Sequence, residues 1–300
     1  MTPIRHVICP TDFSTFSERA LRYAVAVAKW SGADLTVLFA LGGSAAPLRD
    51  APVHRAPVAT DPAARKTLHE RLRRFAEPAA AAGVQVRTEL VDGDVVAAIL
   101  AEARRDSRSL VVLGTHGHGG FENLVLGSVT EKVLRKAPCP VLTVPREPER
   151  GPAAAVLVER ILCAVDFSAS SQAAFDAALD LAAPSGAALT VVHILRELPA
   201  AEAPELAHFN VPEYRRLIEK EARNRLKTFV AGRPPGREAE IRILSGKPWR
   251  RILQLAHEIE ADLIVLGVQG RSAADLLLFG STAHHVVRSA PCPVLTVRTR

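Results

Sequence analysis

The stretch "SLVVLGTHG" at residues 109–117 recurs as "DLIVLGVQG" at residues 262–270. Each copy opens with a short aliphatic run, which indicates a buried strand, and ends with two glycines separated by two residues. Three more segments return 153 or 154 residues downstream: "HVICPTDFS" (6–14) as "RILCAVDFS" (160–168), "GADLTVLFAL" (32–41) as "GAALTVVHIL" (186–195), and "APCPVLTVPR" (137–146) as "APCPVLTVRT" (290–299). The chain is therefore a tandem duplication, with domains at 1–147 and 158–300 and a linker at 148–157.

The composition is typical of a globular protein and excludes several classes. Of 300 residues, 48% are hydrophobic and 23% charged, which suits two domains of ordinary size. We find neither an apolar run of the ~20 residues that a membrane span needs nor a signal-peptide pattern, so we expect a cytoplasmic protein without membrane contact. The net charge of +6 comes from basic residues mixed with acids on helical faces, and aromatics are only 5%. A nucleic-acid partner is therefore not expected.

Strand-like and helix-like segments alternate throughout each half. This alternation predicts an α/β fold: two tandem Rossmann-like domains, each with a parallel sheet that helices cover on both faces. Two Pro- and Ala-rich insertions, at 41–61 and 196–213, are expected to be surface loops or lids over a site.

A ligand site is expected where the strands end, because open parallel sheets bind ligands beyond their carboxyl ends at the topological switch point. Asp12 and Asp166 end the first strand of each half. The fourth strand ends in the frame G-x2-G-x9-G-S, formed by Gly114, Gly117, Gly127 and Ser128 in one half and by Gly267, Gly270, Gly280 and Ser281 in the other. Three glycines in fixed register predict either a backbone that approaches a ligand closely or a positive φ.

Ser128 has two interpretations. With Glu131 three residues later it matches a capping box, in which Ser128 is the N-cap of a helix. A serine at a helix N-terminus also binds phosphate, because free amides and the helix dipole favour an anion there. We favour the phosphate contact because of the glycine frame, and because Ser281 has no reciprocal Glu.

Together, the two glycine frames and the two aspartates resemble the universal stress protein family, in its ATP-binding and tandem-domain form. The resemblance covers nearly the whole chain. It implies an adenine nucleotide alpha hydrolase-like sheet of order 3-2-1-4-5 in each half, ATP bound in each half, and a nucleotide-dependent role in stress regulation. It also implies that the final strands pair between domains, which leaves other surfaces for a homodimer.

The resemblance assigns roles by position. Asp12 and Asp166 would border the adenosine, together with the residues that precede them, Pro10, Thr11, Ala164 and Val165. Ala40 and Ile194 would offer backbone groups to the adenine. The glycine frames and Ser128 and Ser281 would hold the ribose and phosphates, together with their neighbours Thr115, Val129 and Thr282. This chain departs from the pattern at Val268, where the second half has no counterpart of the polar Thr115.

The remaining candidates concern charge and reactivity. His116 and His118 are better explained as loop histidines near phosphates than as metal ligands, since the second half has Gln269 and Arg271 there. Arg271 fits either a terminal phosphate or an exposed surface.

Nothing resembling a Walker lysine is present, so Mg²⁺ is expected to accompany the nucleotide, with Asp12 and Asp166 fitting either that ion or a ribose hydroxyl. A slow ATPase or nucleotidyl-transfer enzyme is one alternative function. A nucleotide-free scaffold or a redox sensor that uses the four cysteines is another, although buried structural cysteines are the commoner case.

Overall fold

The computed structural model describes residues 4–42, 61–116, 126–146, 158–195, 211–231, 239–269 and 279–299. The chain forms two compact units, Thr2–Val156 and Leu157–Thr299, here called domain 1 and domain 2. The predicted linker lies outside the described residues, so the bounds that we assign to it remain a prediction.

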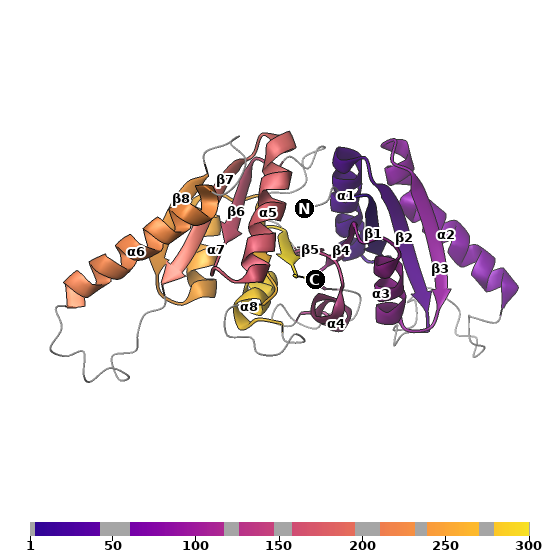
Figure 1. Ribbon diagram of the computed structural model, residues 1–300. Coiled ribbons are helices and arrows are strands. Elements are labelled where there is room, and N and C mark those ends of the chain that lie inside the picture. The colour runs from indigo at the N-terminus through magenta and orange to yellow at the C-terminus, as the bar shows by residue number, and fades with distance from the viewer. Residues whose placement is uncertain are drawn as a thin grey trace. The chain divides into compact units, whose positions relative to one another are not determined.

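Strands and helices alternate in both domains, as the sequence predicts (Figure 1). Domain 1 contains β1 (His6–Pro10), α1 (Thr15–Ser31), β2 (Asp34–Leu41), α2 (Pro62–Ala81), β3 (Val86–Asp92), α3 (Val95–Arg105), β4 (Ser109–Gly114), α4 (Ser128–Lys136) and β5 (Val141–Val144). Domain 2 contains β6 (Arg160–Ala164), α5 (Ala169–Ser185), β7 (Ala188–Leu195), α6 (Val211–Ala231), β8 (Glu240–Ser245), α7 (Pro248–Glu258), β9 (Leu263–Gly267), α8 (Ser281–Ser289) and β10 (Val294–Val297).

All strand pairs within each domain are parallel. In domain 1, β1 pairs with β2 and β4, while β3 and β5 flank them, so the order is β3-β2-β1-β4-β5. Domain 2 has the equivalent order β8-β7-β6-β9-β10. Helix α1 packs against α2, and α3 packs against α4. This pairing follows from right-handed crossovers, because the chain moves across the sheet in one direction from β1 to β3 and in the other direction from β3 to β5. The switch point therefore lies between β1 and β4.

Local sequence explains where the first helix of each domain begins and ends. Ser14 is the N-cap of α1, and its hydroxyl accepts a hydrogen bond from the Ser17 amide. Gly32 ends the same helix in the left-handed conformation that favours glycine. Ser168 and Gly186 repeat both caps on α5. The duplication thus retained the geometry at the start of α1 and α5, next to Asp12 and Asp166.

One boundary differs from the prediction. The sequence predicts a loop that extends to residue 213, but α6 begins at Val211. Pro212 lies in the first turn of this helix, where a missing backbone N–H has no cost. Most of both predicted insertions, residues 43–60 and 196–210, lies outside the described residues.

Candidate functional site

The register of the parallel strands brings the predicted residues of domain 1 to one edge of the sheet. Pro10 pairs with Leu38, so Asp12 falls at the level of Ala40. Ile8 pairs with Val111, so Asp12 also falls at the level of Thr115.

In domain 2, Ala164 pairs with Val192 and with Leu266, so Asp166 falls at the level of Ile194 and Val268. Each domain therefore has an equivalent carboxyl edge, where the aspartate lies between the second and fourth strands.

A strained turn holds Asp12 in place. Phe13 has a φ of 61°, and its repeat Phe167 has a φ of 63°, a conformation that bulky residues rarely adopt. The Asp12 carboxylate accepts hydrogen bonds from the Ser14 amide at 3.0 Å and from the Ser14 hydroxyl at 2.5 Å. Asp166 accepts the equivalent amide bond from Ser168 at 3.0 Å. Such strain is commonly retained at functional sites.

The phenylalanine of this turn contacts an aromatic ring and a guanidinium group, an arrangement that the sequence did not predict. Phe13 stacks on Phe39 with ring centroids 4.8 Å apart, and the Arg71 guanidinium lies 4.3 Å from the Phe13 centroid. In domain 2, Phe167 contacts His193 at 4.5 Å and Arg225 at 4.3 Å in the same way. The return of "DFS" in both halves was the signal available in the sequence.

The side chains beside the aspartates point inward. Thr11 is buried, and its hydroxyl donates to the Ser17 hydroxyl at 3.0 Å while accepting from the Phe13 amide at 2.9 Å. Val165 is buried as well. A ligand at this edge would therefore meet the backbone of these two residues rather than their side chains.

Two of the frame glycines, Gly114 and Gly267, have a steric reason that lies within the fold. None of Gly114, Gly127, Gly267 and Gly280 has a positive φ, so that interpretation is wrong for these four. A Cβ on Gly267 would lie 2.8 Å from the backbone of Ser170 and Ser171, and one on Gly114 would lie 3.3 Å from the Phe16 Cβ. The close approach is thus to the first turn of α5 or α1.

The base of each glycine loop is closed in the same way in both domains. The Gly127 amide donates to the Thr115 carbonyl at 2.9 Å, and the Gly280 amide donates to the Val268 carbonyl at 2.9 Å. Thr115 and Val268 are both only 3% exposed. The departure at Val268 therefore lies in the interior, where Thr115 contacts the His116 ring nitrogen at 3.0 Å, and the backbone of the loop base is unchanged.

The capping-box interpretation of Ser128 is wrong. Gly127 is the N-cap of α4 and Gly280 is the N-cap of α8, and neither helix has a side-chain cap. Ser128 and Ser281 are instead the first helical residues, and both are exposed. Glu131 forms an ion pair with Arg135 at 2.9 Å. The two serine hydroxyls thus make no capping hydrogen bond at the exposed helix N-terminus, and each serine directly follows the glycine whose amide closes the loop base.

The other predicted residues divide into three groups. Pro10, Ala164, Val129 and Thr282 lie at the same edges as their neighbours in the chain. Gly117, His118, Gly270 and Arg271 lie outside the described residues. All four cysteines are buried, and burial raises the pKa of Cys9 to about 12 and that of Cys163 further. In the described ranges no three His, Cys, Asp or Glu residues are grouped to hold a metal ion.

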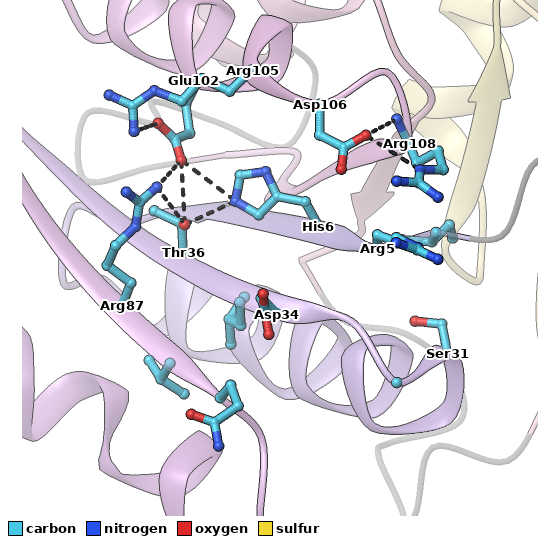
Figure 2. Close-up of a pocket in the computed structure, with 15 residues that line it drawn as sticks. Arg5, His6, Ser31, Asp34, Thr36, Arg87, Glu102, Arg105, Asp106 and Arg108 are labelled. Carbon is cyan, nitrogen blue, oxygen red and sulfur yellow. Dashed lines mark hydrogen bonds and ion pairs between the residues drawn. The ribbon is translucent and has the colours of Figure 1, made fainter.

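A cavity of about 1000 Å³ lies at the opposite edge of the domain 1 sheet, where the strands begin (Figure 2). Sequence reasoning missed it, because its residues come from segments far apart in the chain and match no motif. Its polar side chains include Arg5, His6, Arg87, Glu102, Arg105 and Arg108.

The fold and the duplicated edge define a tandem pair of Rossmann-like α/β domains. The sequence profile of the universal stress protein family matches residues 3–145 and 158–298, so the chain belongs to that family. In the described ranges, no helix combines the length and the hydropathy that a membrane crossing requires.

Individual relatives agree with this assignment. A universal stress protein of Mycobacterium tuberculosis is 31% identical over 219 residues, which cover 71% of this chain but only 66% of that relative. Universal stress protein A homolog 1 of Coxiella burnetii is 35% identical over 142 residues, covering 46% of this chain and 95% of that protein. The crystal structure of a universal stress protein from Archaeoglobus fulgidus has a TM-score of 0.69 at 24% identity and covers 98% of both chains, which shows the shared fold.

Proposed function

We propose that each domain binds ATP at its carboxyl edge and that the protein acts as a nucleotide-dependent regulator of a stress response. The observation that carries this proposal is the position of Ser128 and Ser281. Both hydroxyls lie at exposed helix N-termini without a capping role. A phosphate group at this position would receive hydrogen bonds from the free amides and the hydroxyl, and the helix dipole would favour its charge.

The strand register supports the rest of the arrangement. Asp12 and Ala40 share one level of the domain 1 edge, and Asp166 and Ile194 share the equivalent level in domain 2. A nucleotide whose phosphates contact Ser128 would place its ribose near Asp12 and its base near the backbone of Ala40. The Asp12 carboxylate would either accept hydrogen bonds from the ribose hydroxyls or ligate the magnesium ion of Mg-ATP. The same arrangement applies to Ser281, Asp166 and Ile194.

The residues present also fit a magnesium ion that accompanies ATP. Mg²⁺ keeps several waters and commonly takes only one or two carboxylates, together with phosphate oxygens. Asp12 in domain 1 and Asp166 in domain 2 each supply one such carboxylate at the edge. When bound, the ion would neutralise part of the triphosphate charge.

The first experiment asks what the purified protein carries. Protein purified without added nucleotide is denatured, and the released small molecules are separated by anion-exchange chromatography. We expect adenine nucleotide in the extract and a higher unfolding temperature when Mg-ATP is added. Absence of both results would refute the proposal.

Variants then test the residues that carry the proposal. Ser128→Ala with Ser281→Ala should remove most of the stabilisation by Mg-ATP, because each site loses a phosphate donor while its fold is kept. Ser289→Ala, at the other end of α8, is the matched control and should leave the stabilisation unchanged. Equal stabilisation of the double variant and the control would contradict the assigned role of the two serines. Phosphate release by the wild-type protein is expected to be slow, and rapid turnover would instead favour an enzyme.

A further inference from the structure

The cavity of domain 1 lies at the sheet edge opposite Asp12. Its walls are the first residues of β1, β2 and β3 and the C-terminal end of α3. Its volume of about 1000 Å³ is at the upper end of the range for small-molecule sites. Because parallel strands all begin at this edge, the cavity is separate from the proposed nucleotide site.

Glu102 anchors one end of the cavity. Its side chain is only 5% exposed, and it forms ion pairs with Arg87 and, at 2.8 Å, with Arg105. These two arginine side chains remain 50% and 60% exposed. Arg87 also pairs with Glu89 at 3.2 Å, but a guanidinium has five N–H donors, so these carboxylates leave donors of both arginines available to a ligand. Glu102 therefore holds two guanidinium groups in place, and its single negative charge does not neutralise both.

His6 fills the space beside this carboxylate as a neutral group. Its Nε2 lies 2.9 Å from the Thr36 hydroxyl and 3.4 Å from Glu102, and its Nδ1 lies 3.3 Å from the Ser109 hydroxyl. Burial lowers the pKa of His6, an effect that Arg87 reinforces and Glu102 opposes. A ring whose Nε2–H donates and whose Nδ1 accepts satisfies all these contacts, so the positive charge of the cavity comes from arginine.

A second pair of arginines lies at the other end. Figure 2 shows Arg5 and Arg108 apart from Arg87 and Arg105, with His6 between the two pairs. The Asp106 carboxylate accepts a hydrogen bond from the Arg108 amide at 2.8 Å and lies 3.5 Å from Nε of the Arg108 guanidinium. In the described part of the chain no ion pair involves Arg5. The cavity thus presents basic groups at two ends.

Domain 2 shows that the fold does not need this arrangement. Aligning α3 with α7 places Leu255, which is buried, at the position of Glu102, and Glu258 at the position of Arg105. Strand register places Glu240 opposite Thr190, as Arg87 is opposite Thr36. The sequence repeat places Glu159 at the position of Arg5.

Domain 2 therefore forms the same fold with a buried leucine in place of Glu102 and with acidic residues in place of Arg5, Arg87 and Arg105. A buried ion pair is often no more stabilising than a hydrophobic residue of similar size. The charged cluster of domain 1 is thus a specific feature that fold stability does not account for.

From these observations we propose that the cavity of domain 1 binds a small molecule with phosphate or carboxylate groups, held by Arg87 and Arg105 at one end and by Arg5 and Arg108 at the other. Paired guanidiniums match the planar geometry of such oxyanions and bind them in bidentate fashion. Three carboxylates, Asp34, Glu102 and Asp106, also line the cavity. They favour a ligand that also carries hydroxyl or amine donors.

Titrations with two probes test the proposal and separate the two ligand chemistries. Inorganic pyrophosphate and citrate are each titrated into the full chain and followed by calorimetry and by Trp30 fluorescence. Trp30 is next to the cavity residue Ser31, and Trp249→Phe makes it the single tryptophan. We expect saturable binding of at least one probe, and which of them binds identifies the oxyanion. Absence of saturation by either probe up to about 10 mM would overturn the proposal.

Variants locate the binding. The first is a triple variant, Arg87→Gln, Glu102→Leu and Arg105→Gln. It should fold, because domain 2 already has the buried Leu255 at the position of Glu102. Its affinity for the probe should fall at least about tenfold. Arg5→Gln alone is a second variant, which leaves the Glu102 cluster intact and should weaken binding severalfold.

Two controls separate this site from general electrostatics and from the nucleotide edge. Arg215→Gln with Arg216→Gln, two exposed residues on α6, removes two positive charges and should not change the affinity. The Ser128→Ala and Ser281→Ala variant should retain the Trp30 response. Loss of affinity in the α6 control equal to that in the cavity variant would refute the proposal.

Discussion

Gly267→Ala is expected to destabilise domain 2 through a clash with α5. The new Cβ would lie 2.8 Å from the backbone carbon of Ser170 and the backbone nitrogen of Ser171, so the strand end and the helix must separate. Overpacking of this kind typically costs about 1–3 kcal/mol. The lower entropy of the unfolded alanine chain offsets only about 0.4–1 kcal/mol of it. We therefore expect a net loss of about 1–2 kcal/mol.

Gly114→Ala in domain 1 is the matched comparison. Its Cβ would lie 3.2 Å from the His116 carbonyl oxygen and 3.3 Å from the Phe16 Cβ, contacts that small shifts relieve. The change in free energy of unfolding should stay within about 1 kcal/mol of zero, because strain and unfolded-state entropy oppose each other.

Urea unfolding followed by tryptophan fluorescence measures each domain separately, since Trp30 lies on α1 and Trp249 on α7. Trp30→Phe leaves Trp249, which stacks on His285 at 4.9 Å, as the reporter for domain 2. With a slope of about 2 kcal/mol per molar urea, in the middle of the usual range, Gly267→Ala should lower the midpoint by roughly 0.5–1 M. An unchanged midpoint, or an equal loss in Gly114→Ala measured by Trp30, would refute the steric argument.

Three further outcomes follow from the structure. Burial lowers the pKa of His6 below 6.5, so the imidazole of the unfolded chain binds a proton at a higher pH than that of the folded chain. Domain 1 should therefore lose stability as the pH falls below about 6.5. In urea unfolding at a series of pH values, His6→Asn should reduce this loss. Buried Cys9 and Cys163 should not react with a thiol reagent in the native protein and should react fully in urea, whereas rapid native labelling would revive a redox role. Arg71→Leu should destabilise domain 1 by about 0.5–1 kcal/mol through loss of the contact with Phe13, and Arg73→Leu on the exposed face of α2 should not, as urea midpoints will show.

The sequence by itself determined the duplication, the parallel α/β fold and the edge where Asp12 and the glycine frame lie. Strand and helix periodicity and capping residues such as Ser14 and Gly32 are local properties, so they can be read along the chain. The repeat added a second copy against which each pattern could be checked.

Only the tertiary structure decided what individual residues do. Ser128 fits a capping box in sequence, yet Gly127 caps the helix, because the loop closes onto Thr115 one residue earlier. Gly267 is a glycine because α5 lies against it. The cluster around Glu102 unites β1, β3 and α3, and such a cluster leaves no pattern in the sequence because it is created by packing between distant segments.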